Sequence, residues 1–561
     1  LLQDVPADIE FNAGYFNANP LVNRQFSAVM RSANGATEST SNGVVPSFPA
    51  KDGLADLAPN FQTLNFDSRL GKMSIKVLSP NPVIFADARR YPSLHTEKTP
   101  MFWCGWLAGT QPLSMGHPVE MTVTIHIESP ASQTPESISI HPATTSVPDA
   151  FVPNPQPLQP LEIVPKPKEI TLNAAKNFAL DDATKWSVTA PAGETRLTAA
   201  VGRLMSDEWN IKLPTPNVTE STSDGWCGIR LGDDKPIAFS SEMTNSDWAK
   251  HDDSYRLIVD NTGIQIVSPT ARGAFYGVQT LAQMLRSDSS TVNAPFAEIE
   301  DWPTLQFRGA HWFPSKSGVP FDKKLIHIMA RYKFNYAVIQ CGFTRWDSHP
   351  EIAVTPSISK KDLQDLVNLC RANFIEPIPL LDGPGHAVWM FTNNQHHDLA
   401  EDPKTPYAYA VNNLKSMDFV HDIMSEIIDV FHPKIFHIGG DEVTMRGRFP
   451  NPDNSLNPQG ETVSDLLSKN LIEQHDWLAK RGIKTMIWGD MFLSKKEGAY
   501  AANAHTIEEA QTRRAAIPKD VIVANWQYTD KVDYPSQDLF QKEGLKTIAA
   551  PWYSPLNVRN F

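Results

Sequence analysis

Short apolar runs separated by segments of helical periodicity dominate the chain from residue 301 to its end. Seven such runs recur, at residues 307–312, 336–341, 376–381, 435–439, 484–488, 521–526 and 546–552. Buried strands that alternate with helices form parallel βα units. Seven or eight such units in a row predict an α/β fold of the (β/α)8, or TIM-type, barrel class. An open doubly wound sheet is the alternative, although no glycine-rich dinucleotide-binding sequence follows any run.

The seven apolar runs leave the eighth βα unit of this barrel class without a matching segment. The seventh run ends near Trp552, and only residues 553–561 follow it. A crossover helix and a further strand need roughly 20 residues or more. A barrel without its last strand exposes two strand edges, which proteins usually avoid. We therefore expect the chain to be a C-terminally truncated part of a longer protein, with a strand-wide gap between the first and seventh strands.

The beginning of the chain has a different pattern. Residues 1–140 contain runs such as 73–78 and 119–127, in which apolar and polar positions alternate as they do in half-buried strands. This pattern predicts a β-rich accessory domain. Residues 141–160 are rich in proline, a composition that suits a stiff linker.

Residues 161–300 mix strand and helix signals. Two apolar runs, 255–259 and 264–267, flank the turn sequence Asn-Thr-Gly at 261–263. Glycine supplies the positive φ that a tight turn needs, so this segment is predicted to be a β-hairpin. Apolar positions at helical spacing follow in residues 274–285. The segment as a whole is predicted to be a small α+β domain, which leaves 301–561 as the barrel.

The composition and net charge limit the kinds of molecule that the protein is expected to bind. The 561 residues are 41% hydrophobic and 20% charged, as in ordinary globular proteins, and the net charge is −13. Phosphate binding needs a basic face, so this charge argues against nucleic acid and fits a neutral substrate. No apolar run is long enough to span a membrane. The sequence carries no signal for oligomeric state.

The four cysteines, Cys104, Cys227, Cys341 and Cys370, lie far apart and lack the C-x-x-C spacing of structural zinc sites. We expect buried free thiols, with one disulfide as the alternative. The chain starts without an initiator Met and without a signal-peptide pattern, so a processed chain or a fragment is expected. The expected location is extracytoplasmic or secreted.

Polar and aromatic side chains gather where the predicted barrel strands end, which is where barrel enzymes carry their active sites. These candidates are Arg308, Asp382, His386, His437, Asp441, Glu442, Trp488, Asp490, Trp526, Tyr528, Trp552 and Tyr553. Sugars need this mixture, because carboxylates bind hydroxyls and drive acid catalysis while aromatic faces pack on pyranose rings. Taken singly, His386 would more often be a structural histidine and Trp488 a core residue.

The strongest signal is the segment His437-Ile-Gly-Gly-Asp441-Glu442. Two adjacent carboxylates at a strand end repel each other and lose hydration, which is costly without a use. The alternative is a solvated loop that merely carries charged residues, but the flanking glycines and the position at a strand end favour a functional site.

This segment resembles the signature of glycoside hydrolase family 20, the β-N-acetylhexosaminidases. Further similarity to the family's α+β domain, its entry into the barrel and its third strand is found in residues 163–168, 255–285, 301–303, 308–309 and 377–386. The resemblance covers roughly residues 161–530 and is absent from the first segment.

The resemblance implies retaining, substrate-assisted hydrolysis of terminal non-reducing N-acetylhexosamine (GlcNAc or GalNAc) from a glycan or oligosaccharide, with no cofactor and no metal. It implies that Glu442 is the general acid and later the base for water. Asp441 would hold the acetamido N–H and steer its carbonyl oxygen towards the anomeric carbon. Two neighbours on one strand end cannot easily flank a bond from both faces, so attack by the substrate's own acetamide makes physical sense.

The resemblance also implies contacts with the sugar for other candidates. Arg308 would bind hydroxyls at the closed end of the site, His386 would tune the general acid, and Asp490 would bind a hydroxyl. The walls around the acetamido group and the sugar ring would be Trp488 and Trp526.

Two strand ends depart from the family pattern. The second strand usually ends with histidines and a pair of Asp residues, but 335–346 lacks the carboxylate that would support His386, unless Asp347 replaces it. The seventh strand normally delivers a Tyr and an Asp, and here either Tyr553 or Tyr528 is left to bind the acetamide oxygen. Two alternatives stay open: a carbohydrate-binding protein that has lost catalysis, and a hydrolase that releases a disaccharide from an N-acetylated glycan.

Overall fold

The computed structural model describes residues 163–215, 225–287 and 291–561 in full and, outside these ranges, the backbones of the strands. The chain forms two compact units, residues 1–149 and 150–561. The predicted proline-rich linker at 141–160 lies outside the described residues, and the division into four segments stays a prediction.

The strands described in the first unit are paired antiparallel, as a β-rich segment predicts. One sheet has the order β11 (Val123–Glu128), β7 (Gly71–Val77), β6 (Phe61–Ser68), β3 (Gln25–Arg31) and β4 (Glu38–Val44). A second has the order β2 (Ile9–Asn17), β9 (Met101–Ala108), β8 (Ile84–Asp87) and β5 (Ala55–Ala58). The predicted strands at 73–78 and 119–127 correspond to β7 and β11.

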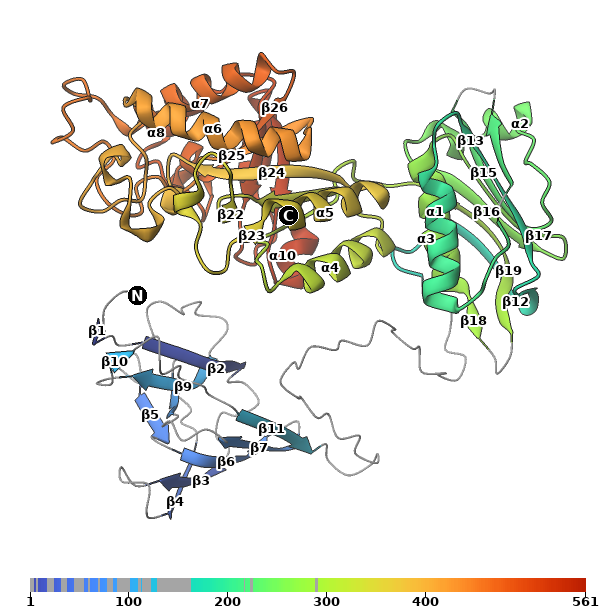
Figure 1. Cartoon of the computed structure of the whole chain (residues 1–561), viewed down its shortest axis with the longest axis horizontal. Coiled ribbons are helices and arrows are strands. Elements are labelled where there is room, and N and C mark those ends of the chain that lie inside the picture. Colours follow the sequence, from blue (N-terminus) through green and yellow to red (C-terminus); the bar gives the residue numbers. More distant parts are fainter. Residues whose placement is uncertain are drawn as a thin grey trace. The chain divides into compact units, whose positions relative to one another are not determined.

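The second unit begins with an α+β arrangement, in which helices cover one face of a sheet (Figure 1). The helices are α1 (Arg196–Arg203) and α3 (Ala271–Met284). The sheet order is β12 (Glu169–Leu180), β19 (Val292–Asp301), β16 (Tyr255–Asp260), β17 (Gly263–Ser268), β15 (Cys227–Gly232), β13 (Lys185–Pro191) and β14 (Asn217–Ser221). Strands β16 and β17 form the predicted hairpin, and Gly263 has a φ of +138°. A Cβ there would lie 2.3 Å from the carbonyl oxygen of Leu231, so the turn requires glycine.

Each of the seven apolar runs forms one strand of a curled parallel sheet, so the predicted barrel class is confirmed. The order is β20 (Gly309–Trp312), β21 (Tyr336–Gln340), β24 (Glu376–Gly383), β25 (Ile435–Gly439), β26 (Lys484–Trp488), β27 (Ile522–Trp526) and β28 (Lys546–Ala550). Within the described residues β20 and β28 are the two edges of this sheet and do not pair with each other. That the chain is part of a longer protein stays a prediction.

Helices follow the strands and cover the outer face of the sheet (Figure 1). They are α4 (Val319–Arg331), α5 (Lys360–Ala372), α6 (Leu414–Phe431), α7 (Val463–Ala479), α8 (Ile507–Ala515), α9 (Pro535–Lys542) and α10 (Pro555–Asn560). The inner face carries an apolar cluster of Val338, Ile378, Leu380, Met486 and Ala524. Burying a Val, Leu, Ile or Met side chain stabilises the fold by roughly 1.5–3 kcal/mol, so this cluster fixes the strands whose ends carry the site.

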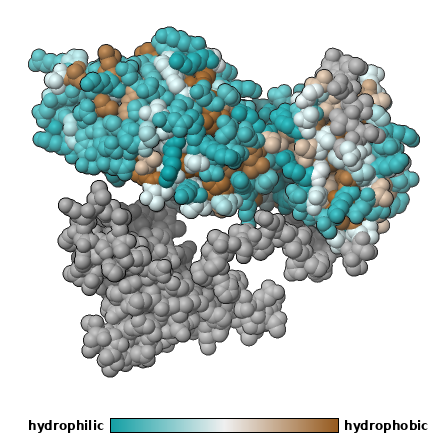
Figure 2. All heavy atoms as spheres, viewed as in Figure 1, coloured by the Kyte–Doolittle hydropathy of each residue, from teal (hydrophilic) through white to brown (hydrophobic). Residues whose placement is uncertain are grey.

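Three of the cysteines, Cys227, Cys341 and Cys370, are buried free thiols, as expected, and Cys104 lies outside the described side chains. None of the helices in the described ranges is long and apolar enough to cross a membrane. The surface of these ranges in view is largely hydrophilic, with scattered apolar side chains (Figure 2).

Candidate active site

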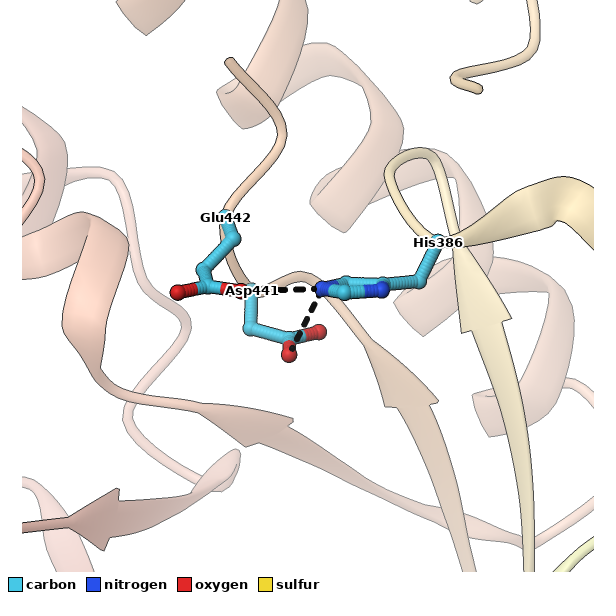
Figure 3. Close-up of side chains that lie close together, drawn as sticks. All are labelled: His386, Asp441 and Glu442. Atoms are coloured by element: carbon cyan, nitrogen blue, oxygen red, sulfur yellow. Dashed lines mark hydrogen bonds and ion pairs between the residues drawn. The ribbon is translucent and has the colours of Figure 1, made fainter. Parts of the chain in front are cut away.

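Charged side chains from two neighbouring strands meet at the carboxyl ends of the barrel strands. His386 follows β24, and Asp441 and Glu442 follow β25. The Nε2 atom of His386 lies 3.2 Å from Oε2 of Glu442 and 3.4 Å from Oδ2 of Asp441, so one imidazole faces both carboxylates (Figure 3). The three residues offer ligand atoms within 4.8 Å of one another, a spacing at which they could also share one cation.

The backbone that presents the two carboxylates turns sharply after β25. The φ angles are +73° at Gly439, +93° at Gly440 and +43° at Glu442, in the left-handed region that only glycine enters freely. A Cβ on Gly439 would lie 2.8 Å from the Cα of Asp382, so the close approach of β24 also requires glycine there. For Glu442 this conformation costs about 1–3 kcal/mol, and such strain persists mainly at functional sites.

Asp490 holds the backbone of Glu442 in place through hydrogen bonds. It follows β26 and is only 1% exposed. Its Oδ2 accepts hydrogen bonds from the backbone N–H of Glu442, at 3.0 Å, and from the side chain of Asn503. Its Oδ1 accepts one from Nε1 of Trp526, at 3.0 Å. The structure therefore places Asp490 as a group that fixes the backbone of Glu442, rather than at the predicted contact with a sugar hydroxyl.

The buried charges shift one another's pKa values. Burial raises the pKa of Asp441 to about 7, and the negative charge of Asp382 adds to this effect. Burial alone would lower the pKa of His386, but its hydrogen bond to Glu442 and the charges of Asp441 and Asp382 raise that pKa to about 9. The imidazole is therefore protonated at neutral pH. The Oδ1 atom of Asp441 is buried and has no partner in the described part of the chain, so it can accept a hydrogen bond from a ligand.

Arg308 does not belong to this group, which corrects the role expected from the sequence. The strand begins at Gly309, so Arg308 lies at its amino end, whereas active-site residues of a barrel lie at the carboxyl ends. Its Nε donates to the carbonyl oxygen of Lys333 at 2.8 Å, and its guanidinium also donates to the hydroxyl of Tyr276 at 2.9 Å. Its backbone N–H donates to Asn335 at 2.9 Å. The expected role came from the resemblance, whereas the apolar run at 307–312 already placed Arg308 near the beginning of the strand.

Asp347 does not replace the missing carboxylate behind His386. Its side chain is 80% exposed and pairs with Lys360 at 2.9 Å. At the end of the second strand, Gln340 instead donates a hydrogen bond to Asp382, whose charge acts on His386. Gln340 was not among the candidates, although a polar residue at the end of an otherwise apolar run is a usable signal.

Two family models match this chain, and they adjoin. The model described as "Glycosyl hydrolase family 20, catalytic domain" matches residues 298–556, and "Glycosyl hydrolase family 20, domain 2" matches residues 160–302. The chain belongs to glycosyl hydrolase family 20.

Relatives of this family 20 chain are distant. It is 22% identical over 287 residues to a lacto-N-biosidase of Bifidobacterium bifidum, covering 49% of this chain and 24% of that protein. It is 24% identical over 326 residues to a beta-hexosaminidase of Porphyromonas gingivalis, covering 50% and 39%. The chain thus spans less than half the length of these two relatives. The structure of a family 20 β-N-acetylhexosaminidase from Streptomyces coelicolor matches with a TM-score of 0.51 and 20% identity, over 69% of this chain and 74% of that one, which supports the fold.

Four of the aromatic candidates of this family 20 chain form a row. The ring centroids of Trp526 and Tyr528 are 4.9 Å apart, those of Tyr528 and Trp552 are 5.2 Å apart, and those of Trp552 and Tyr553 are 4.9 Å apart. Trp552 and Tyr553 are 60% and 56% exposed, whereas the first two are half-buried. The row therefore leads from a strand end to solvent, an arrangement that suits aromatic packing on a ligand.

Tyr528 is the tyrosine closer to the charged group. Burial raises its pKa, and the negative charge of Asp441 adds to the rise. Tyr553 stands at the exposed end of the row. The ring of Tyr500 meets Trp526 edge-on with centroids 6.2 Å apart, so Tyr500 joins the site. Tyr500 was not predicted from the sequence because it lies in the segment between β26 and α8, which has no periodic pattern.

His437 is 1% exposed, and its position differs from the expected sugar contact. Its Nδ1 accepts a hydrogen bond from the backbone N–H of Gly439 at 3.1 Å, and its ring lies 4.3 Å from that of Trp488. Burial holds its pKa well below the usual range, so it is neutral. His437 therefore shapes the turn that carries the carboxylates. Trp488 is half-buried and packs against the rings of His437 and His311, and its role as a wall of the sugar site stays a prediction.

Proposed function

We propose that this chain hydrolyses the glycosidic bond of a terminal non-reducing N-acetylhexosamine residue, GlcNAc or GalNAc, by a retaining, substrate-assisted mechanism. The observation that carries the proposal is the placement of Asp441 and Glu442 side by side on one turn, both within reach of a single imidazole. An extracytoplasmic or secreted location belongs to the same proposal, and cell fractionation tests it.

The adjacency of the two carboxylates favours attack by the substrate itself. A retaining enzyme with a protein nucleophile places its two carboxyl groups on opposite sides of the scissile bond, about 5–5.5 Å apart. Asp441 and Glu442 leave consecutive residues of one turn and face the same ring of His386. Because these two carboxylates lie side by side, the 2-acetamido group of the substrate is the nucleophile that fits.

In the proposed first step the acetamido carbonyl oxygen bonds to the anomeric carbon as the glycosidic C–O bond breaks. The carboxyl group of Glu442 gives its proton to the leaving oxygen. The unpartnered Oδ1 of Asp441 accepts the hydrogen bond of the acetamido N–H and stabilises the positive charge that develops there. The hydroxyl of Tyr528, which lies in the field of Asp441, binds the acetamide oxygen.

In the second step water attacks the anomeric carbon and opens the oxazolinium ring. Glu442 takes the proton of this water, which restores the acid for the next cycle. Two inversions at the anomeric carbon give overall retention. His386 holds both carboxylates in place through these steps, because its protonated Nε2 contacts an oxygen of each.

The alternatives rest on separate observations. The similarity to a lacto-N-biosidase favours a second candidate, release of a disaccharide from an N-acetylated glycan. A protein that only binds carbohydrate has no need for the strained, partly buried Glu442, because a binding site gains nothing from a second acid beside Asp441.

The decisive experiment is hydrolysis followed by proton NMR of the first-formed sugar. Nitrophenyl β-glycosides of N-acetylglucosamine, N-acetylgalactosamine and an N-acetylated disaccharide form the panel. The proposal expects a monosaccharide product released as the β-anomer. Release of the disaccharide alone supports the second candidate, the α-anomer contradicts retention, and no hydrolysis of any member supports a binding protein.

We expect Asp490→Asn to lower kcat by a factor on the order of 10², with KM nearly unchanged, because small misplacements of a reacting group carry that cost. The amide has the shape of the carboxylate, but its NH2 group is a hydrogen-bond donor. It would face the N–H of Glu442 or the side-chain NH2 of Asn503, which are donors themselves, so one hydrogen bond would be lost. Steady-state kinetics on the preferred panel substrate measure the effect. Asp429→Asn, at an exposed position of α6, is the matched control and leaves kcat unchanged. A change confined to KM would indicate a sugar contact instead.

We expect Arg308→Met to lower stability by about 1–3 kcal/mol without changing KM, because the carbonyl of Lys333 and the hydroxyl of Tyr276 lose a charged donor. Urea denaturation measures the loss of stability, and steady-state kinetics of the same preparation measure KM. A large rise in KM at unchanged stability would restore the sugar-binding role expected from the sequence.

A further inference from the structure

His386, Asp441 and Glu442 form a compact set of metal-ligand types. An imidazole nitrogen and two carboxylate oxygens lie within 4.8 Å of one another, and the nitrogen is 3.2 Å and 3.4 Å from the two oxygens (Figure 3). The side chains are 32%, 18% and 32% exposed, so an ion can reach them from solvent.

The two nitrogen-to-oxygen distances match the spacing of ligand atoms around a first-row transition metal. Zinc lies about 2.0–2.2 Å from nitrogen and oxygen ligands, which puts two ligand atoms of a tetrahedral site about 3.3–3.5 Å apart. One imidazole with two carboxylates suits Zn²⁺, Co²⁺ or Cu²⁺, whereas Mg²⁺ and Ca²⁺ prefer oxygen ligands alone. Three protein ligands leave one position for water.

The backbone already holds these ligands in place. Glu442 is fixed by its strained φ of +43° and by the hydrogen bond of its N–H to Asp490. The hydroxyl of Tyr407 donates to the carbonyl oxygen of Glu442 at 3.2 Å. The metal would therefore gain its three ligands with little rearrangement of the chain, which favours affinity.

We propose that His386, Asp441 and Glu442 together bind one divalent transition-metal ion, and that this binding reversibly inhibits the protein. The ion takes the place of the proton on Nε2 of His386, which is released to solvent. It binds the carboxylate of Glu442, which then has no proton to give, and its positive charge cancels the charge with which Asp441 stabilises the acetamido group. Inhibition rests on the proposed function, whereas binding of the ion does not.

A second histidine–carboxylate cluster provides the control. Oε1 of Glu351 lies 3.1 Å from Nδ1 of His349 and 3.1 Å from Nε2 of His396. Within the described residues, however, the set of three at the strand ends is the one whose ligand atoms all lie within 4.8 Å of one another. Removing His349 therefore tests for adventitious binding through a histidine–carboxylate pair elsewhere in the chain.

The binding experiment uses the chain freed of metal with EDTA and titrated with CoCl2, read by visible absorption, and with ZnCl2, read by calorimetry. We expect one ion per chain. His386→Ala and His386→Gln should each weaken binding by about tenfold or more, and His349→Ala should bind as the wild type does. Circular dichroism establishes that the variants are folded. Absence of binding, binding that survives both His386 variants, or binding lost in His349→Ala would each overturn the proposal.

The kinetic experiment measures hydrolysis of nitrophenyl N-acetylglucosaminide with ZnCl2 or MgCl2 present. Saturating Zn²⁺ should abolish turnover, EDTA should restore it, and Mg²⁺ should have no effect. Full turnover at Zn²⁺ saturation would refute inhibition while leaving the proposed function intact. Metal binding with no hydrolysis by the EDTA-treated chain would instead refute the proposed function and leave the metal site standing.

Discussion

Glu442→Gln lowers turnover of an unactivated glycan by a factor on the order of 10² to 10⁴ while sugar binding is retained, because a general acid is lost and its shape is kept. Glutamine fills the same volume beside His386 but has no acidic proton to give to the glycosidic oxygen. The measurement is kcat on an N-acetylglucosamine oligosaccharide, together with calorimetric binding of N-acetylglucosamine.

The leaving group supplies an internal check on this prediction. A nitrophenolate leaves without full protonation, so the nitrophenyl glycoside should lose less turnover than the oligosaccharide. Glu508→Gln, at an exposed position of α8, removes the same charge elsewhere and should leave kcat unchanged. Near-normal turnover of the oligosaccharide by Glu442→Gln would show that Glu442 is not the general acid.

A plain glucoside is expected to react more slowly than the matching N-acetylglucosaminide by a factor on the order of 10³ or more. The glucoside lacks the acetamide, and intramolecular attack by a well-placed group has an effective molarity of roughly 10⁵ to 10⁸ M. The ratio of kcat/KM for the two nitrophenyl glycosides measures the effect. Equal values for the pair would refute substrate assistance.

Two further observations on the same preparation separate this mechanism from simple recognition of the acetamido group. A cyclic thiazoline, which mimics the oxazolinium intermediate, should inhibit far more strongly than N-acetylglucosamine. Asp441→Ala should weaken thiazoline binding and lower kcat, because the partner of the acetamido N–H is gone. If Asp441→Ala changed KM alone, Asp441 would stabilise the bound substrate and the transition state equally, and would have no part in the chemical step.

The local elements of this protein were predictable from the sequence because they depend on neighbours in the chain. All seven apolar runs became parallel strands, and the segment 255–267 became a hairpin around Gly263. The proximity of Asp441 and Glu442 needed no fold at all, since they are consecutive. Their place at a strand end followed from the apolar run before them and the two glycines between.

Only the tertiary structure decided which distant residues support that pair. Asp490 reaches Glu442 from 48 positions away and accepts a hydrogen bond from Asn503, and Gln340 on one strand donates to Asp382 on the neighbouring strand. The sequence does not show how neighbouring strands are aligned. It therefore could not tell that Gln340, and not Asp347, lies beside Asp382. Arg308 failed for a different reason: its role came from the resemblance alone, and only the structure shows that its guanidinium is held at the amino end of β20 by Lys333 and Tyr276.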